Sequence, residues 1–124
     1  MQSYNRKGDQ LNPDVSFDAS SGMLSIKGKS IPLDEHAFLD DLITWLQHYE
    51  QEPHAKTHLE IDLKYLNGKS IRSLLAIFSA LKNLQNKGKE VDVEWFVPKD
   101  ADDLHDLSEQ MLSTLDLPHH IRLN

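Results

Sequence analysis

The clearest pattern in the chain is the alternation of apolar and polar residues along two segments. Apolar side chains stand at every second position from Leu59 to Tyr65, with charged residues between them. The same spacing recurs from Val91 to Val97, and Pro98 follows directly. Because successive side chains of a strand point to opposite faces, both segments predict half-buried strands.

Shorter segments add further strands. Val15–Asp18 and Met23–Lys27 alternate in the same way, and the turn between them ends in Gly22, where a positive φ is expected. A loop is predicted for Gly28–Leu33. The final segment, His119–Leu123, is predicted to be an edge strand.

Three segments instead repeat apolar residues every three or four positions, which is typical of amphipathic helices. The first runs from Asp34 to Gln51 after Pro32. The second begins with Ser70 as predicted N-cap and stops at Gly88. The third follows the acidic loop of residues 100–103. Their apolar positions are Phe38, Leu42, Trp45, Leu46 and Tyr49; Ile71, Leu74, Leu75, Phe78, Leu81 and Leu84; and Leu104, Leu107, Met111 and Leu115.

This order of elements predicts one α/β domain with a mixed β-sheet flanked by about three α-helices. The domain is expected to span residues 12–124. Residues 1–11 are polar and are predicted to form a flexible N-terminal tail.

Composition argues against several classes of function. The chain has 124 residues, 39% of them hydrophobic, and a net charge of -7 from 13 basic and 20 acidic residues. This balance, without a Lys/Arg cluster, disfavours nucleic acid as a partner. There is no cysteine, so disulfides and thiol chemistry are excluded. With neither a signal peptide in residues 1–10 nor an apolar run long enough to cross a bilayer, the sequence predicts a cytoplasmic protein without a membrane partner.

The junction Asn67–Ser70 contains a Gly-Lys-Ser triplet that suggests a phosphate-binding loop. Such a loop requires another glycine five positions before Gly68, so that the backbone can wrap the phosphates. Leu63 stands there, on the core face of its predicted strand. The nucleotide-binding interpretation is therefore rejected.

The same junction still opens a helix, and the free N–H groups at a helix start attract anions, including a covalently attached phosphate. The simpler interpretation is a plain turn from strand to helix. Lys69 does not suit that interpretation, because a cation in the first turn opposes the helix dipole by ~0.3–1 kcal/mol. Lys69 therefore indicates weakly an interaction outside the helix.

Seven histidines and an acidic stretch raise the question of a metal site. His119 and His120 are adjacent and should point to opposite faces of a strand, whereas His36 and His48 are too far apart on one helix. Residues 100–106 resemble a calcium loop in composition alone, because that loop's required glycine and glutamate are absent. No metal, cofactor or catalytic constellation is predicted, and both tryptophans are expected in the core.

Taken together, short motifs along most of the chain resemble the SiaC family of regulatory phosphoproteins, which are relatives in fold of the STAS-type anti-sigma factor antagonists. Each motif is weak alone, but their order and spacing are specific. They are Pro13, Val15, Phe17 and Asp18; Gly22, Leu24, Ile26, Gly28, Ser30 and Pro32; Trp45, Leu46 and Tyr49; Tyr65, Leu66, Asn67 and Ser70; Val91, Val93 and Trp95; the acidic residues 100–106; and Leu117 and Pro118.

The resemblance implies a STAS-like fold and a switch without enzymatic activity. Family members are phosphorylated at the strand-to-helix junction by a partner Ser/Thr kinase and dephosphorylated by a PP2C-like phosphatase. The unphosphorylated form binds and activates a diguanylate cyclase with a GGDEF domain, which raises cyclic di-GMP and promotes biofilm formation. A phosphate of about -1.5 to -2 charges at an exposed helix start suits this role.

The chain departs from the family pattern at the junction itself. The resemblance places a phosphoacceptor threonine after the asparagine, but this chain has Gly68 there, and Leu33-Asp34 also replaces the usual Glu-Asn. Three interpretations follow, in order of preference: a constitutive binder, phosphorylation of Ser70 instead, or a different partner.

The predicted partner-binding surface comprises Asn67, Gly68, Lys69, Ser70, Arg72 and Ser73, with Ser70 as the candidate phosphoacceptor. The alternative function is a STAS-like antagonist of an anti-sigma factor, or another signalling module, with no cyclase as partner.

Overall fold

A computed structural model describes residues 2–31 and 35–124. For residues 35–39 it describes the backbone alone. The predictions for Pro32, Leu33, Asp34 and the side chain of Phe38 lie outside the described residues. In chain order the elements are β1 (Tyr4–Arg6), β2 (Asp14–Asp18), β3 (Met23–Ser30), α1 (Glu35–Tyr49), β4 (Lys56–Leu66), α2 (Gly68–Asn86), β5 (Glu90–Val97), α3 (Asp102–Thr114) and β6 (His119–Leu123).

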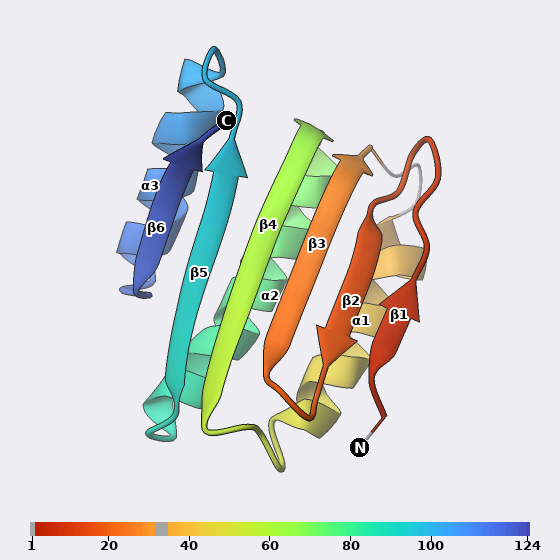
Figure 1. Cartoon of the computed structure of the whole chain (residues 1–124), viewed down its shortest axis with the longest axis vertical. Coiled ribbons are helices and arrows are strands. Elements are labelled where there is room, and N and C mark those ends of the chain that lie inside the picture. The colour runs from red at the N-terminus through yellow and green to blue at the C-terminus, as the bar shows by residue number, and fades with distance from the viewer. Residues whose placement is uncertain (1, 32–34) are drawn as a thin grey trace.

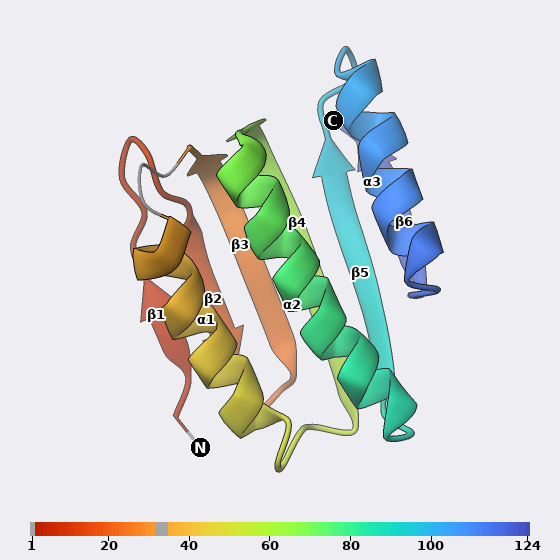
Figure 2. The same ribbon diagram turned by 180° about the vertical axis from the view of Figure 1, so that it is seen from behind.

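The six strands form one mixed sheet in the order β1-β2-β3-β4-β5-β6. The first three strands pair antiparallel, and β3 through β6 pair parallel. All three helices lie on the same side of the sheet, which leaves the other side uncovered (Figures 1 and 2). The predicted mixed α/β architecture with three helices is confirmed.

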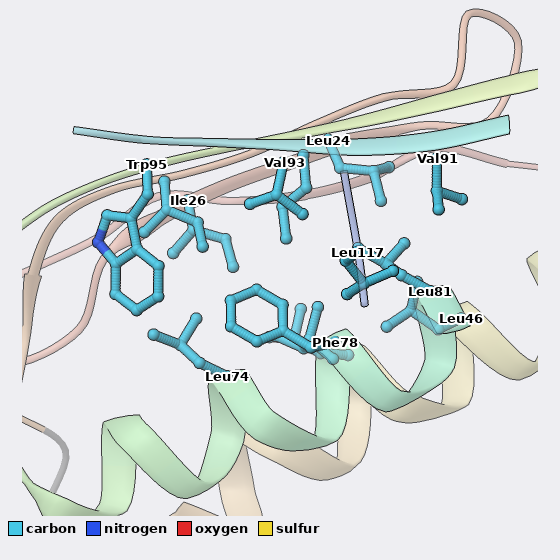
Figure 3. Close-up of a cluster of buried hydrophobic side chains, with 14 of the residues drawn as sticks. Leu24, Ile26, Leu46, Leu74, Phe78, Leu81, Val91, Val93, Trp95 and Leu117 are labelled. Carbon is cyan, nitrogen blue, oxygen red and sulfur yellow. The ribbon is translucent and has the colours of Figure 1, made fainter. Parts of the chain in front are cut away.

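The core fills the space between the sheet and the helices (Figure 3). It forms one continuous cluster of apolar residues from β2, β3, β4, β5 and all three helices, and Tyr4 on β1 and Ile121 on β6 pack against it. Trp95 is fully buried, and its ring lies 5.8 Å from that of Phe78 on α2. At the other end of the sheet, Trp45 stacks on Tyr49 with ring centres 5.0 Å apart. Both tryptophans are core residues, as predicted.

The uncovered face of the sheet carries the polar half of each alternating strand. Ion pairs join neighbouring strands there, with Lys27 and Glu60 at 3.4 Å and Arg122 and Glu94 at 2.5 Å. Parallel sheets are usually covered on both faces, but alternation of apolar and charged residues allows one face to remain in water. The sequence pattern thus explains why the helices cover one side only.

Most sequence predictions agree with these elements. Gly22 has a φ of 73°, and a Cβ there would lie 2.2 Å from the carbonyl oxygen of Lys56, so glycine is required. The predicted strand His119–Leu123 is present as the sheet edge β6. Helix α2 ends shortly before Gly88, which has a φ of 88°. Within the described residues, no helix is both long and apolar enough to cross a membrane.

Four predictions of local structure are wrong. Residues 1–11 do not form only a flexible tail, because Tyr4–Arg6 pairs with β2. The loop predicted from Gly28 begins later, since β3 continues to Ser30. The N-cap of α2 is Asn67 and not Ser70. Tyr65 is 57% exposed, because the β3–β4 register shifts after Gly28 and turns this side chain away from the core face.

Candidate functional site

The predicted site lies at the carboxyl end of β4, where the chain passes directly into α2. Asn67 is the one residue between the two elements, and its side chain accepts a hydrogen bond from the backbone N–H of Ser70 at 3.0 Å. This bond satisfies one of the N–H groups that a helix start leaves without a partner. Asn67 therefore fixes the direction in which α2 leaves the sheet.

Ser70 anchors the helix start to the neighbouring strand. Its hydroxyl oxygen lies 2.6 Å from the hydroxyl oxygen of Ser30 at the end of β3, and it also contacts the Ser30 carbonyl. A further contact of 3.1 Å reaches the side-chain oxygen of Asn67. Ser30 and Ser70 are only 3% and 2% exposed. The hydroxyl of Ser70 is thus a structural group within the fold.

Of the six residues of the predicted surface, four are at least partly exposed and two are buried. Gly68 and Arg72 are exposed, and Asn67 and Lys69 are half-buried. Ser70 and Ser73 are buried, and the hydroxyl of Ser73 donates to the Lys69 carbonyl at 3.0 Å. These two serines therefore add nothing to the exposed surface, because both lie on the side of α2 that faces the protein interior.

Gly68 leaves an open position at the first residue of α2. A Cβ built there would meet only the guanidinium of Arg72, at an ordinary distance of 3.8 Å. Its φ lies outside the left-handed region, so the backbone does not require glycine. A side chain at this position would extend into solvent without displacing anything.

A groove that the sequence did not reveal begins at this position. It has a volume of about 360 Å³ and separates the start of α2 from the first turns of α3. Its walls are formed by half-buried Leu66, Ile71, Leu104 and Leu107, with Gly68 and Asp103 at the rim. In Figure 2 the two helices run over different strands, and β5 is visible between them.

One signal in the sequence could have indicated the groove. Ile71 and Leu75 lie one turn apart and widen the apolar stripe of α2 beyond what the sheet covers. Leu75 is 40% exposed as a result. No pattern could have shown that α3 stands far enough from α2 to leave this stripe open.

The acidic stretch borders the groove from the side of α3. Asp102 and Asp103 lie in the first turn of this helix, and its N-cap Ala101 provides no side-chain hydrogen bond. Carboxylates at a helix start are stabilised by the helix dipole. Asp102, Asp103 and Asp106 are all exposed, as the prediction of an acidic loop and helix start implied.

The loop that nucleotide binding would require before Gly68 is not formed. Leu63 is 1% exposed in the middle of β4, so no loop precedes Gly68. The part of the chain that the structure describes holds no group of three His, Cys, Asp or Glu side chains suited to a metal ion. His119 and His120 lie on opposite faces of β6, and His119 contacts Glu109 at 2.9 Å.

Comparison with known proteins places this geometry in context. The SiaC family of regulatory phosphoproteins matches residues 6–123. An uncharacterised protein of Pseudomonas aeruginosa strain UCBPP-PA14 is 24% identical over 98% of this chain and 97% of its own length.

Solved structures of SiaC from Pseudomonas aeruginosa share the fold. One superposes with a TM-score of 0.90 at 23% identity and covers 100% of both chains. Another contains SiaC as the activator of the diguanylate cyclase SiaD, in complex with it, with a TM-score of 0.89 and 23% identity over 98% of this chain and 99% of that one. At this level of identity, the likeness describes the fold.

Proposed function

Because the chain belongs to the SiaC family of regulatory phosphoproteins, we propose that it regulates a diguanylate cyclase by binding to it, without being an enzyme itself. The binding surface is the start of α2, with Asn67, Gly68, Lys69 and Arg72. The fold is shared with a SiaC that was solved in complex with its cyclase SiaD. Its location in the cytoplasm and the absence of membrane and nucleic-acid partners stay predictions.

The regulation differs from that of a phosphorylated switch. The observation that carries this proposal is that no hydroxyl group is exposed between Asn67 and Ser73. Gly68 has no side chain, and Ser70 and Ser73 are each 2% exposed. A kinase must reach a hydroxyl with its active site, and here both hydroxyls are engaged in internal hydrogen bonds. We therefore favour a constitutive binder.

Two interpretations compete with this one. Phosphorylation of Ser70 would require the helix start to open, since its hydroxyl contacts Ser30 inside the protein. If the partner were a different protein, such as an anti-sigma factor, the same surface would bind that protein and no cyclase would be involved. Both make distinct experimental predictions.

The test begins with affinity capture of the tagged chain from its native cells, followed by purification of any GGDEF cyclase that is captured. Synthesis of cyclic di-GMP is then measured with and without the chain, before and after incubation with the cognate kinase and ATP. We expect activation in both cases and no change in the intact mass of the chain.

Three results would contradict the proposal. Stoichiometric phosphate on Ser70 with loss of activation would show a switch that uses the buried serine. Capture of an anti-sigma factor without a cyclase would establish the alternative function. Activation that survives Arg72→Glu and Lys69→Glu, but is lost on substitution of the uncovered sheet face, would place the binding surface elsewhere.

A further inference from the structure

We propose that Met23, His54 and His58 form a binding site for one soft metal ion, Cu(I). The three side chains line a pocket of about 360 Å³ beside the starts of β3 and β4. In Figure 1 these starts lie at the opposite end of the sheet from the carboxyl end of β4, where α2 begins. The metal site is therefore separate from the binding surface of the proposed function and does not depend on it.

The pairing of β3 with β4 brings a thioether and an imidazole side by side. Met23 and His58 are direct partners in this parallel pairing, and neighbouring strands lie only about 4.8 Å apart. Met23 is 50% exposed, and His58 is half-buried. Both side chains stand on the face of the sheet that no helix covers, so a metal ion can reach them from solvent.

Gly22 brings the second histidine to the same place. A Cβ built on Gly22 would lie 3.1 Å from the Cβ of His54. The carbonyl of Gly22 accepts a hydrogen bond from the backbone N–H of His58 at 2.9 Å. The residue directly before Met23 thus contacts both histidines, which explains why all three donors line one pocket.

The hydrogen bonds of the two imidazoles orient them as metal ligands. The Nδ1 of His58 donates to Oδ2 of Asp92 at 2.9 Å, and the Nδ1 of His54 donates to the Lys56 carbonyl at 3.1 Å. The backbone N–H of Lys56 is farther from His54 Nδ1, at 3.4 Å. An imidazole that carries its proton on Nδ1 keeps a lone pair on Nε2 for a metal. Both histidines are therefore held in the ligating tautomer.

Asp92 gives a second, independent indication of a positive charge at this site. Its Oδ2 accepts from His58, but its Oδ1 is buried and accepts no hydrogen bond from any residue that the structure describes. A buried carboxylate oxygen without a partner costs free energy. A cation on Nε2 of His58 would offset this cost, as in the carboxylate–histidine–metal arrangements of other proteins.

The donor set determines which metal is bound. Two imidazoles and one thioether favour Cu(I), because thioether sulfur is a soft ligand and imidazole also suits copper. A search for three His, Cys, Asp or Glu side chains cannot reveal this cluster, since its third donor is a methionine. Lys56 also lines the pocket, but its side chain is exposed and long enough to turn its charge into solvent.

The test is a Cu(I) titration of the full-length chain against the coloured chelator bicinchoninate, without oxygen and with ascorbate as reductant. We expect the chain to withdraw one equivalent of Cu(I) from the chelator. X-ray absorption of the copper-loaded chain should show a sulfur neighbour. Because the chain has no cysteine, that sulfur must belong to a methionine.

Variants assign the ligands. Met23→Leu and His54→Gln should each weaken Cu(I) binding at least about tenfold, and Met23→Leu should also remove the sulfur neighbour. Both side chains are exposed, so the urea midpoints of these variants without metal should equal that of the original chain. His48→Gln and His120→Gln, which replace exposed histidines on α1 and β6, are the matched controls and should bind Cu(I) as the original chain does.

Asp92→Asn tests the positioning of His58. This substitution keeps an oxygen that can accept from His58 but removes the negative charge, so Cu(I) affinity should fall about tenfold. A purely structural Asp92 would change the urea midpoint and leave Cu(I) affinity unchanged, and this result would contradict its role. Three results would overturn the site itself: no withdrawal of Cu(I) from the chelator, equal losses in the control variants, or tighter binding of Zn²⁺ than of Cu(I).

Discussion

At the scale of single residues, Ser70 connects α2 to β3 through a buried hydroxyl pair. Ser70→Ala would remove this contact and leave the Ser30 hydroxyl without its buried partner. We expect the free energy of unfolding to fall by about 1–2 kcal/mol. The control is Ser79→Ala, whose hydroxyl donates to the Leu75 carbonyl on an exposed face, and which should change stability by less than about 0.5 kcal/mol. Urea titration of both variants measures the difference.

Gly68 provides the second prediction at this scale. Gly68→Thr should fold normally and raise the free energy of unfolding by up to about 0.5 kcal/mol, because glycine loses more backbone entropy in a helix. It should also restore an exposed acceptor, so the cognate kinase should add one phosphate and lower cyclase activation. Gly68→Val has the same shape without a hydroxyl and should gain stability only. Phosphate on the original chain under these conditions would contradict the interpretation.

At the scale of elements, β1 gives a direct test of the N-terminal segment. Tyr4 faces the core side, with its ring 6.4 Å from that of Phe17, whereas Asn5 is exposed on the other face. Tyr4→Ala should lower the free energy of unfolding by about 1–2 kcal/mol, because half-buried apolar surface is lost. Asn5→Ala should have little effect. If residues 1–11 were only a frayed tail, the two variants would be indistinguishable.

The contact between His119 on β6 and Glu109 on α3 predicts that the free energy of unfolding depends on pH. Burial alone would lower the pKa of His119, but its hydrogen bonds to the Glu109 carboxylate and the Leu117 carbonyl outweigh this and raise the pKa above 6.5. The hydrogen bond from His119 lowers the pKa of Glu109 below 4.5. The stabilisation from His119 is therefore lost as pH rises through its raised pKa, and that from Glu109 is lost as pH falls through its lowered pKa.

The ion pair should accordingly contribute most to stability between about pH 5 and 6. His119→Gln should lower the free energy of unfolding most in that window. The difference in this free energy between the variant and the original chain should shrink above about pH 7.5. His120→Gln, on the opposite face of β6, is the control and should show no such maximum. Denaturant titrations across this pH range measure both, and a constant difference for His119→Gln would contradict the role of the ion pair.

Elements differ in how far sequence predicts them, for a physical reason. The strands β4 and β5 were predicted because half-burial imposes alternation on the strand itself. β1 was missed because Tyr4 is its only apolar residue and its pairing with β2 is a tertiary contact. At the site, local sequence predicted a helix directly after β4 but placed its N-cap at Ser70, three residues beyond the actual cap Asn67. The burial of Ser70 did not follow from local sequence, because it depends on Ser30, which lies 40 residues earlier in the chain.

At the scale of the whole molecule, the one-sided arrangement separates two surfaces. The uncovered sheet face is mainly polar and crossed by ion pairs, such as Lys27 with Glu60, although Met23 and Tyr65 are exposed on it. The helical face carries the start of α2 and the apolar groove beside α3. The two surfaces are therefore chemically distinct, and a partner that buries apolar side chains is expected on the helical face.

The continuous core also predicts that residues 12–124 unfold as one unit together with β1. Trp45 reports on the β1–β2 end of the sheet and Trp95 on the β5 end, and both belong to the same buried cluster. In Trp45→Phe the remaining fluorescence follows Trp95, and in Trp95→Phe it follows Trp45. We expect the fluorescence midpoint in urea to coincide with the far-UV circular dichroism midpoint within each variant, as in a two-state domain. Separate midpoints would show that the antiparallel and parallel halves of the sheet unfold independently, and the single core would then not make this chain one cooperative domain.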